Sequence, residues 1–386
     1  MKDITRYIKC TVERELWARA AGRCQFNGCN RIVYKSDVTQ ERVNVAEKAH
    51  IYSFSKDGPR GWGPFVTNQK QLNDLANLLL VCHDCHETID QGDSVTRYPA
   101  TRLIAWKHEH EDRVRIVTGI HPNKRSHVIL YGGKIGQEDS PLEPELAIEA
   151  MFPEWYPSEE RPTELAMSSE HEDSTELFWK TEAAHLRAAF ERHIRPRIRE
   201  ANPNHFSVFA RAGQPLLILL GTLLTDKVPA EIYQLQREPI SWRWQADSED
   251  LGFRVISPEK KDGDPVLVIS ASAKISLDRV TSVVGNNASI WELTTDQCHN
   301  NVLKSRAQLS AFREAARRVA ARIAEVHGQS VPLKIFPAMP VACALELGRI
   351  RMPKADMPWI IYDQNNKAGK FLYALEIGGS HDGQDR

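Results

Sequence analysis

The 386-residue sequence has no long apolar run. Its longest candidate, residues 215–224, is far shorter than the roughly 20 residues that a membrane-spanning helix needs. The N-terminal residues 1–7 also lack the apolar core of a secretory signal peptide. We therefore expect a cytoplasmic protein that has no membrane partner.

The sequence also lacks an excess of positive charge, since its formal net charge is −1. Residues 1–120 are mildly basic, with 18 Lys and Arg against 15 Asp and Glu, whereas residues 138–176 hold 13 acidic residues and one basic residue, Arg161. Non-specific affinity for DNA comes mainly from displaced counterions. A single copy should therefore bind DNA weakly, and the acidic stretch should repel it.

The length exceeds that of a usual single hydrophobic core, so we expect more than one domain. The domain limits we predict are residues 1–120, a junction over 121–176, and residues 177–386. In the first domain we predict helices and a hairpin, at residues 11–21 (helix), 31–34 with 43–51 (hairpin), 71–80 (helical spacing), from about 82 onward (helix) and 98–117 (helix).

The last domain alternates helical patterns with short apolar strands, which is typical of parallel sheets covered by helices on both faces. The pattern also allows two related halves that divide near Asn286. In the junction we predict one strand at 127–131. In the last domain we predict strands at 206–209, 230–236, 266–269, 333–336 and 359–362, and helices at 179–199, 215–224, 309–326 and 341–347.

Cysteine is scarce, at seven residues, but four of the seven form two close pairs, Cys24/Cys29 and Cys82/Cys85. Such pairs in a chain without a secretory leader are typical of metal ligands and not of disulfides. Four thiolates bind Zn²⁺ tetrahedrally, and a small domain often needs such a metal to complete its core. The spacing predicts a structural zinc site; the alternative is four free thiols.

One ordered set of residues resembles the HNH endonucleases, which cut DNA at a small ββα-metal site: Cys24, Cys29, His50, Asn77, Cys82, Cys85 and His86. The resemblance implies that His50 is the general base that takes a proton from the attacking water. It implies that Asn77 ties down the loop between hairpin and helix, and that His86 binds a catalytic cation, Mg²⁺ or a similar divalent ion.

The second ligand of this cation is not fixed by the resemblance. Many HNH enzymes carry a ligand immediately before the base, where this chain has Ala49. Asp90 lies four residues after His86 and therefore on the same helical face. Asp90 is our candidate ligand, and the alternative is a carboxylate that is solvated or paired with Arg97.

Several segments of the last domain resemble the SAVED domain, the sensor of cyclic oligonucleotides in bacterial antiphage signalling (CBASS): residues 205–209, 214–217, 221–227, 233–244, 336–340, 347–349, 352–356 and 361–363. The resemblance implies two fused Rossmann-like (CARF-like) α/β halves. It also implies that these halves clasp a cyclic di- or trinucleotide made by a partner CD-NTase cyclase.

The residue types in these segments suit such a ligand. Trp242 and Trp244 could stack on bases, while Arg237 and Lys354 could meet phosphates. Phe336 ends a strand, where open α/β sheets bind ligands. The alternative for the Trp-Arg-Trp run is an ordinary half-buried strand.

An HNH domain ahead of a SAVED domain is the architecture of a CBASS effector nuclease. We therefore expect a bacterial enzyme that cleaves double-stranded DNA once a cyclic nucleotide binds. One HNH site cuts one strand, so we expect a homo-oligomer, a dimer that assembles to a tetramer or higher. Two alternatives are an HNH restriction endonuclease whose second domain recognises modified DNA, and a zinc-finger DNA binder without enzymatic activity.

Overall fold

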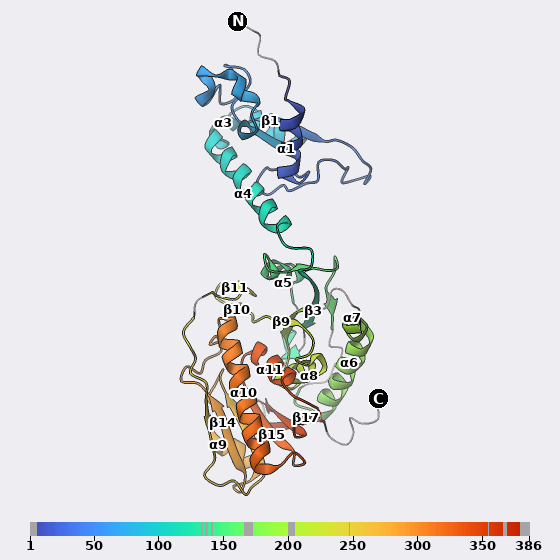
Figure 1. Cartoon of the computed structure of the whole chain (residues 1–386), viewed down its shortest axis with the longest axis vertical. Helices are drawn as coiled ribbons and strands as arrows, with labels where there is room; N and C mark the ends of the chain where they lie inside the picture. The colour runs from blue at the N-terminus through green and yellow to red at the C-terminus, as the bar shows by residue number, and fades with distance from the viewer. Residues whose placement is uncertain are drawn as a thin grey trace. The chain divides into compact units, whose positions relative to one another are not determined.

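The computed structural model divides the chain into two compact units, Met1–His121 and Pro122–Arg386 (Figure 1). Within the described residues, no helix is both long and apolar enough to cross a bilayer. The structure describes residues 6–132, 134–135, 138–139, 142–165, 173–199, 205–246, 248–353, 355–365 and 369–378.

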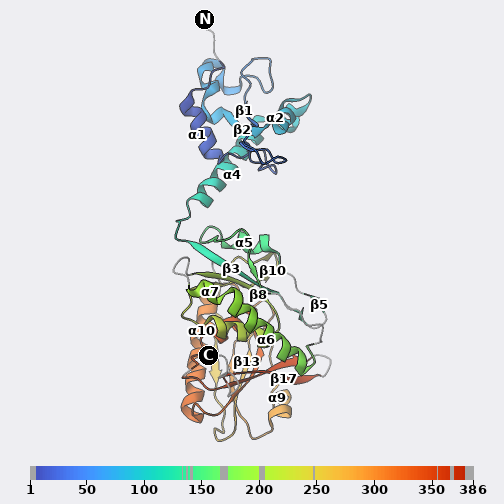
Figure 2. The ribbon, with the colours of Figure 1, turned by 90° about the vertical axis from the view of Figure 1, so that its right-hand side faces the viewer.

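The first unit is built on one antiparallel pair of strands, β1 (Ala46–His50) and β2 (Leu78–Cys82), which lie beside α1 and α4 (Figure 2). All five residues of β2 are buried, so this short strand is the centre of a small hydrophobic core. The remaining elements of the unit are α1 (Cys10–Ala20), α2 (His83–Asp90), α3 (Ser94–Arg97), α4 (Ala100–Thr118) and the 3₁₀ turns η1 (Gly63–Thr67), η2 (Gln69–Asn73) and η3 (Leu75–Asn77).

The helices predicted at 11–21, after Cys82 and at 98–117 are confirmed as α1, α2 and α4. The predicted hairpin is wrong, because β1 pairs with β2 and not with residues 31–34. The helical spacing predicted over 71–80 is confirmed only in part: its first residues lie in the 3₁₀ turns η2 and η3, whereas the apolar end from Leu78 is strand β2. A short, fully buried apolar run shows no hydrophobic periodicity, so its sequence does not distinguish a strand from a helix.

The second unit contains two separate sheets. In the first sheet the strand order is β6-β3-β8-β9, β7 also pairs with β3, and every pairing is parallel. The strand predicted at 127–131 is therefore not part of an exposed linker, because β3 is paired on both sides. The bounds are β3 (Arg125–Gly132), β6 (Tyr156–Pro157), β7 (Thr163–Glu164), β8 (Phe206–Arg211) and β9 (Ala230–Ile232); β4 (Lys134–Ile135) and β5 (Glu138–Asp139) form a separate pair, as do β10 (Gln236–Arg237) and β11 (Ile240–Ser241).

The second sheet has the order β12-β14-β13-β15-β16-β17, with four parallel strands in the middle and an antiparallel strand at each edge. A division near Asn286 is wrong, because β13 before it pairs with both β14 and β15 after it. The two halves divide between β9 and β12. The bounds are β12 (Arg254–Ile256), β13 (Pro265–Ser270), β14 (Ser289–Thr294), β15 (Leu333–Ala338), β16 (Trp359–Asn365) and β17 (Lys370–Ile377).

Helices separate the two sheets and cover their outer faces. The largest hydrophobic cluster joins one face of each sheet to α6, α8, α10 and α11, whereas α5 covers the other face of the first sheet and α9 the other face of the second. This layering confirms the predicted α/β class. The bounds are α5 (Pro144–Met151), α6 (Glu176–His193), α7 (Arg195–Arg199), α8 (Gln214–Leu224), α9 (Leu277–Val284), α10 (Arg306–His327) and α11 (Val341–Arg349).

Helices α8 and α11 lie side by side and come unusually close where two glycines meet (Figure 1). A Cβ on Gly221 would lie 2.1 Å from the carbonyl oxygen of Leu345, and a Cβ on Gly348 would lie 2.0 Å from that of Ile218. Since these are backbone atoms inside helices, neither can move without shifting a whole helix. The crossing therefore accepts only glycine at both positions.

Replacing either glycine should destabilise the second unit. In an exposed helix Gly→Ala stabilises by roughly 0.5–1 kcal/mol, but here the added methyl group overpacks a backbone contact, at a cost of about 1–3 kcal/mol. We expect G221A and G348A each to lower the free energy of unfolding in urea, whereas S282A on exposed α9 leaves it unchanged. A rise in stability for G221A would contradict the close crossing.

Candidate functional site

The four paired cysteines converge on one point in the first unit. The Sγ atoms of Cys24, Cys29, Cys82 and Cys85 all lie within 4.8 Å of one another, and those of Cys29 and Cys82 are 3.9 Å apart. Cys82 ends β2 and Cys85 lies in the first turn of α2, so the cluster joins the sheet to the helix. Four sulfur atoms at these separations fit a tetrahedral Zn²⁺ site.

The thiols of this cluster cannot all ionise without a cation. Burial raises the pKa of Cys24 to about 12, with added repulsion from Cys29 and Cys82. Burial and the charge of Cys24 likewise raise the pKa of Cys85. Burial also opposes ionisation of Cys82, yet hydrogen bonds from Cys85 and the other thiols lower its pKa. A divalent ion that accepts four thiolates removes this conflict.

His50 is the last residue of β1 and is only partly buried. Its Nε2 lies 2.9 Å from Oδ1 of Asn73, whose Nδ2 donates to the carbonyl oxygen of Tyr7 at 3.3 Å. Because the amide oxygen of Asn73 faces Nε2, that nitrogen carries the hydrogen and Nδ1 keeps its lone pair. Burial lowers the pKa of His50, so the ring is neutral at pH 7. A neutral, oriented imidazole can act as a general base.

Asn77 is buried and holds the loop that follows β1. Its Oδ1 accepts from the Tyr52 backbone at 2.8 Å, and its Nδ2 donates to the carbonyl oxygens of Tyr52 at 3.0 Å and Leu72 at 2.9 Å. The side chain therefore ties the residues just after His50 to those just before β2.

His86 and Asp90 occupy one face of α2, with His86 Nε2 3.8 Å from Asp90 Oδ2. Burial is the largest cause acting on the pKa of His50 and lowers it, and the charges of both residues also act on His50: Asp90 raises its pKa and His86 lowers it. The other oxygen of Asp90 accepts from Nη2 of Arg60 at 2.5 Å. Arg60 is the ion-pair partner of Asp90, in place of the Arg97 that the sequence suggested.

Arg60 also fixes the backbone around the site. Its side chain is only 3% exposed, and it donates to the carbonyl oxygens of Ile51 at 2.5 Å and Ile89 at 2.8 Å. It thereby links the residue after His50 to the residue before Asp90. Nothing in its sequence position signalled this role, because a buried arginine looks like a surface one in a sequence.

The residues present fit a catalytic cation. His86 Nε2 and Asp90 Oδ2 can bind the same ion, and a hard divalent cation completes its shell with water and substrate oxygens. Ala49, at the position of the usual additional ligand, is 1% exposed and belongs to the hydrophobic core. The pairing of Asp90 with Arg60 reduces the negative charge available to the ion.

The second unit holds a cavity of about 1180 Å³ at the carboxyl ends of the parallel strands of both sheets. The N-termini of α8 and α11 both face it, which favours anionic groups. Arg211, which ends β8, and Arg237, in the β10–β11 hairpin, add positive charge. Open α/β sheets bind ligands at this edge, and the volume suits a ligand of several nucleotides.

Two backbone N–H groups, one just before α11 and one in its first turn, have partners from the first half. Gln214 Oε1 accepts from the Met339 backbone at 3.3 Å, and Gln234 Oε1 accepts from the Ala342 backbone at 3.1 Å. Both glutamines line the cavity. The first half therefore caps a helix of the second half at the point where a ligand would dock.

The structure brings only some of the predicted ligand residues to this cavity. Arg237 lines it, and Trp242 lines it while packing edge-on against Phe209. Trp244 is half-buried outside the lining, as the alternative of an ordinary packed strand suggested. Phe336 is fully buried on the far face of the second sheet, where it stacks on Tyr362. Lys354 lies outside the described residues.

Three cavity residues were missed by the sequence analysis. Arg211 and Asp363 lie at the carboxyl ends of β8 and β16, and Gln234 follows β9. Their common signal was available, since each is a polar residue at or just beyond the end of an apolar strand. The prediction gave weight to aromatic and basic residues instead.

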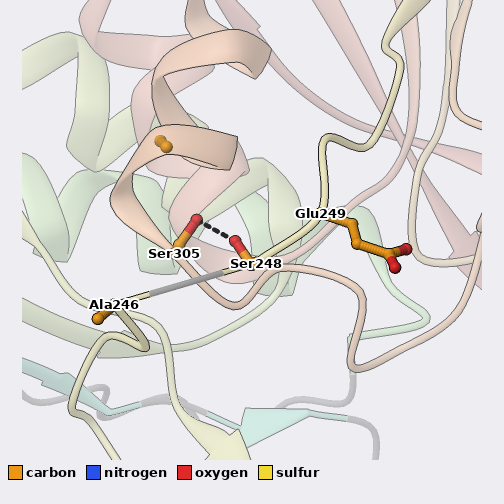
Figure 3. A pocket seen from close by; sticks show the side chains of 5 residues that line it. Ala246, Ser248, Glu249 and Ser305 are labelled. Atoms are coloured by element: carbon orange, nitrogen blue, oxygen red, sulfur yellow. Dashed lines mark hydrogen bonds between the residues drawn. The ribbon is translucent and has the colours of Figure 1, made fainter.

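A second hollow, of about 440 Å³, lies beside the start of α10 (Figure 3). Its two serines already have partners: Ser248 donates to Ser305, whose side chain caps α10 by accepting from the Gln308 backbone at 3.3 Å. These serines therefore offer a ligand little to bind.

Together these sites define a class of protein in which one unit carries a tetrathiol cluster together with a histidine–carboxylate pair, and the other a cavity large enough for several nucleotides. Comparison with family models finds the same two parts. Residues 24–95 match the HNH endonuclease family, and residues 186–377 match SAVED, the SMODS-associated and fused to various effectors sensor domain. The chain thus consists of an HNH endonuclease domain followed by a SAVED sensor domain.

Similar solved structures are receptors that contain a SAVED/CARF domain. Acinetobacter baumannii Cap4 with the cyclic trinucleotide 2′3′3′-cAAA is 13% identical, with a TM-score of 0.41, and the match covers 72% of this chain and 55% of that one. The same receptor with 3′3′3′-cAAA is 12% identical, with a TM-score of 0.42, and the match covers 80% of this chain and 66% of that one. Moraxella osloensis Cap4 is 12% identical, with a TM-score of 0.36, and the match covers 72% of this chain and 57% of that one. This chain thus spans little more than half the length of these receptors. A comparison with curated proteins gave no match.

The thiol cluster predicts one zinc ion per chain. We expect purified protein to contain one equivalent of zinc by mass spectrometry, and C24S to lose most of it because three thiolates leave the tetrahedral shell incomplete. C24S should also lower the melting temperature of the first unit, since metal binding contributes to folding. The matched control is C10S, whose thiol is exposed on α1. Full zinc content in C24S would contradict the site.

Asp363 predicts a pH-dependent stability. Burial, with Asp173 nearby, raises its pKa from 3.8 to about 7. A raised carboxyl pKa means that the folded state holds the proton more tightly, so this group destabilises the protein increasingly as pH rises from about 4 to 7. D363N, which is always neutral, should stabilise the protein by about 1–3 kcal/mol at pH 8 and by almost nothing at pH 4. Urea unfolding at both pH values measures this; equal effects would refute it.

Proposed function

We propose that this chain is a cyclic-oligonucleotide-activated, metal-dependent DNA endonuclease of a bacterial CBASS system. The observation that carries the nuclease part is that a neutral, oriented His50 and the His86–Asp90 pair occur within a domain that matches the HNH family. The cavity of the SAVED domain supports the sensor part.

In the proposed reaction His50 accepts the proton of the attacking water at Nδ1. Asn73 holds the imidazole through Nε2 and stabilises the tautomer that leaves Nδ1 free. The lowered pKa of His50 keeps this nitrogen unprotonated at neutral pH. Asn77 and Arg60 fix the backbone on either side, so the base is positioned before the substrate arrives.

His86 and Asp90 would hold the divalent cation, Mg²⁺ or a similar ion. When bound, such an ion neutralises charge on the scissile phosphate and on the departing oxygen. The zinc site would hold β2 and α2 together and take no part in the chemistry.

We further propose that the activating ligand is a cyclic di- or trinucleotide made by a partner cyclase. Its phosphates suit the N-termini of α8 and α11 together with Arg211 and Arg237. Each chain has one HNH centre, so cleavage of double-stranded DNA requires two chains close together. Assembly of a dimer into a tetramer or larger oligomer would also compensate for the weak DNA affinity of one copy.

Plasmid cleavage tests this function. With Mg²⁺ and a panel of cyclic di- and trinucleotides, we expect linear DNA in the presence of one ligand and intact plasmid without it. H50A should lower the activated rate by about 10²–10⁴-fold, because it removes the general base. H83A is the control: His83 is exposed beside the thiol cluster and should leave the rate unchanged.

The same assay separates the alternatives. Cleavage that needs no ligand but requires modified bases would indicate a restriction enzyme and remove the sensor proposal. Activity that is unaffected by H50A and by chelation of Mg²⁺ would indicate a DNA-binding protein and remove the nuclease proposal.

A further inference from the structure

Asp363 occupies a special position at the cavity of the SAVED domain. The pairing of β16 with β15 ends at Ile361, whereas the pairing with β17 continues to Asn365. The two strands separate beyond Ile361, although β15 itself continues to Ala338. Asp363 lies beyond this point of separation and lines the cavity, together with Gln364 and Asn365.

Among the described residues, no lysine or arginine forms an ion pair with Asp363. Asp173 opposes ionisation of its carboxyl group, and a hydrogen bond from the Gln364 backbone favours it. The charged residues that line the cavity are Glu143, Asp173 and Asp363 against Arg211 and Arg237. The carboxyl group of Asp363 is partly buried and lines the cavity, so it can accept hydrogen bonds from a ligand that enters.

The phosphates and bases of a cyclic nucleotide differ in how well they can bind a carboxylate. Phosphates carry only acceptors and negative charge, so they are repelled here and belong at the helix N-termini and the two arginines. Among the bases, guanine presents two adjacent donors, N1–H and N2–H, which one carboxylate can accept together. Adenine and cytosine each offer one exocyclic donor next to an acceptor. The donor-rich edge of guanine therefore complements Asp363 best.

We propose that Asp363 binds the N1–H and N2–H edge of a guanine base, so that the activating cyclic nucleotide contains guanine. This inference rests on the proposed sensor function and adds the identity of one base. Asp173 lies on the same side of the cavity and reinforces its preference for donors.

The protonation of Asp363 supports the proposal. Burial raises its pKa to about 7, so part of the ligand-free protein carries a proton there at neutral pH. Two guanine donors favour the ionised carboxylate, so binding releases this proton and strengthens as pH rises through 7. Glu143 and Asp173 line the same cavity and oppose ionisation, while Arg211 and Arg237 favour it.

Calorimetric titration of the full chain tests the base preference. The probes are cyclic trinucleotides of identical linkage with either three adenines or two adenines and one guanine, and cyclic di-GMP against cyclic di-AMP. On the unaltered protein we expect a guanine-containing ligand to bind at least about tenfold more tightly than its all-adenine counterpart, as a bidentate pair provides. Tighter binding of the all-adenine ligand would overturn the proposal.

The D363N variant provides a second test, in which the base preference is expected to be lost or reversed. An asparagine presents one donor and one acceptor, which complement N1 and N6 of adenine. We expect D363N to lose the guanine preference and to bind the all-adenine ligand at least as tightly as the guanine ligand. The control is D278N on exposed α9, which should keep the original preference. An unchanged preference in D363N would also overturn the proposal.

The outcomes separate this inference from the function beneath it. Binding of all-adenine ligands alone refutes the guanine contact and leaves the sensor intact. Failure of every cyclic nucleotide to bind the unaltered protein refutes the sensor, and the base contact with it. The comparison of ligands on the unaltered protein does not depend on whether any variant folds.

Discussion

The close contact of α8 with α11 at Gly221 and Gly348 is the constraint on which the sensor domain depends. It sets two helices from different halves at backbone distance, and so aims both N-termini at one cavity. Arg349 reinforces the contact, since it pairs with Glu346 at 2.6 Å and donates to the Val228 carbonyl oxygen at 2.8 Å. A ligand site formed by two halves exists only because this joint is rigid.

The HNH domain has only a small hydrophobic core, so it depends on other contacts for its stability. Polar groups replace the missing apolar contacts: four thiols join β2 to α2, Asn77 ties the loop after β1, and Arg60 connects both sides of the site. The same groups hold the backbone just after His50. The stability of this unit and the placement of His50 therefore depend on the same contacts.

Much of this could be predicted from the sequence. The cysteine pairs and the histidines are local signals of known chemistry, and the long amphipathic period of α10 specifies a helix without reference to anything else. The pairing of β1 with β2 could not be predicted, because a run such as Leu78–Cys82 that is buried on every side carries no period. The partner of Asp90 was missed for a related reason: Arg60 is thirty positions away in sequence and is brought close only by the fold.

The cavity shows the same limit. Sequence patterns identify the strands whose ends form it, yet the face on which each side chain lies depends on tertiary packing. Phe336 and Trp244 were reasonable choices by residue type. In the fold, however, Phe336 belongs to a separate hydrophobic cluster, and Trp244 packs outside the cavity lining. Arg211 and Asp363 carry only a weak sequence signal, a polar residue at the end of an apolar strand, and their shared position becomes clear only once the strand ends are assembled.

The two glutamines at the start of α11 have a consequence for which anionic ligands can bind there. Gln214 and Gln234 already satisfy two backbone N–H groups that an incoming phosphate would seek. Displacing both forfeits about 2 kcal/mol, or roughly thirtyfold in affinity. A small anion with few other contacts would be disfavoured by this cost, whereas a ligand that contacts both halves could offset it. The two glutamines thus set a free-energy threshold for binding at the start of α11.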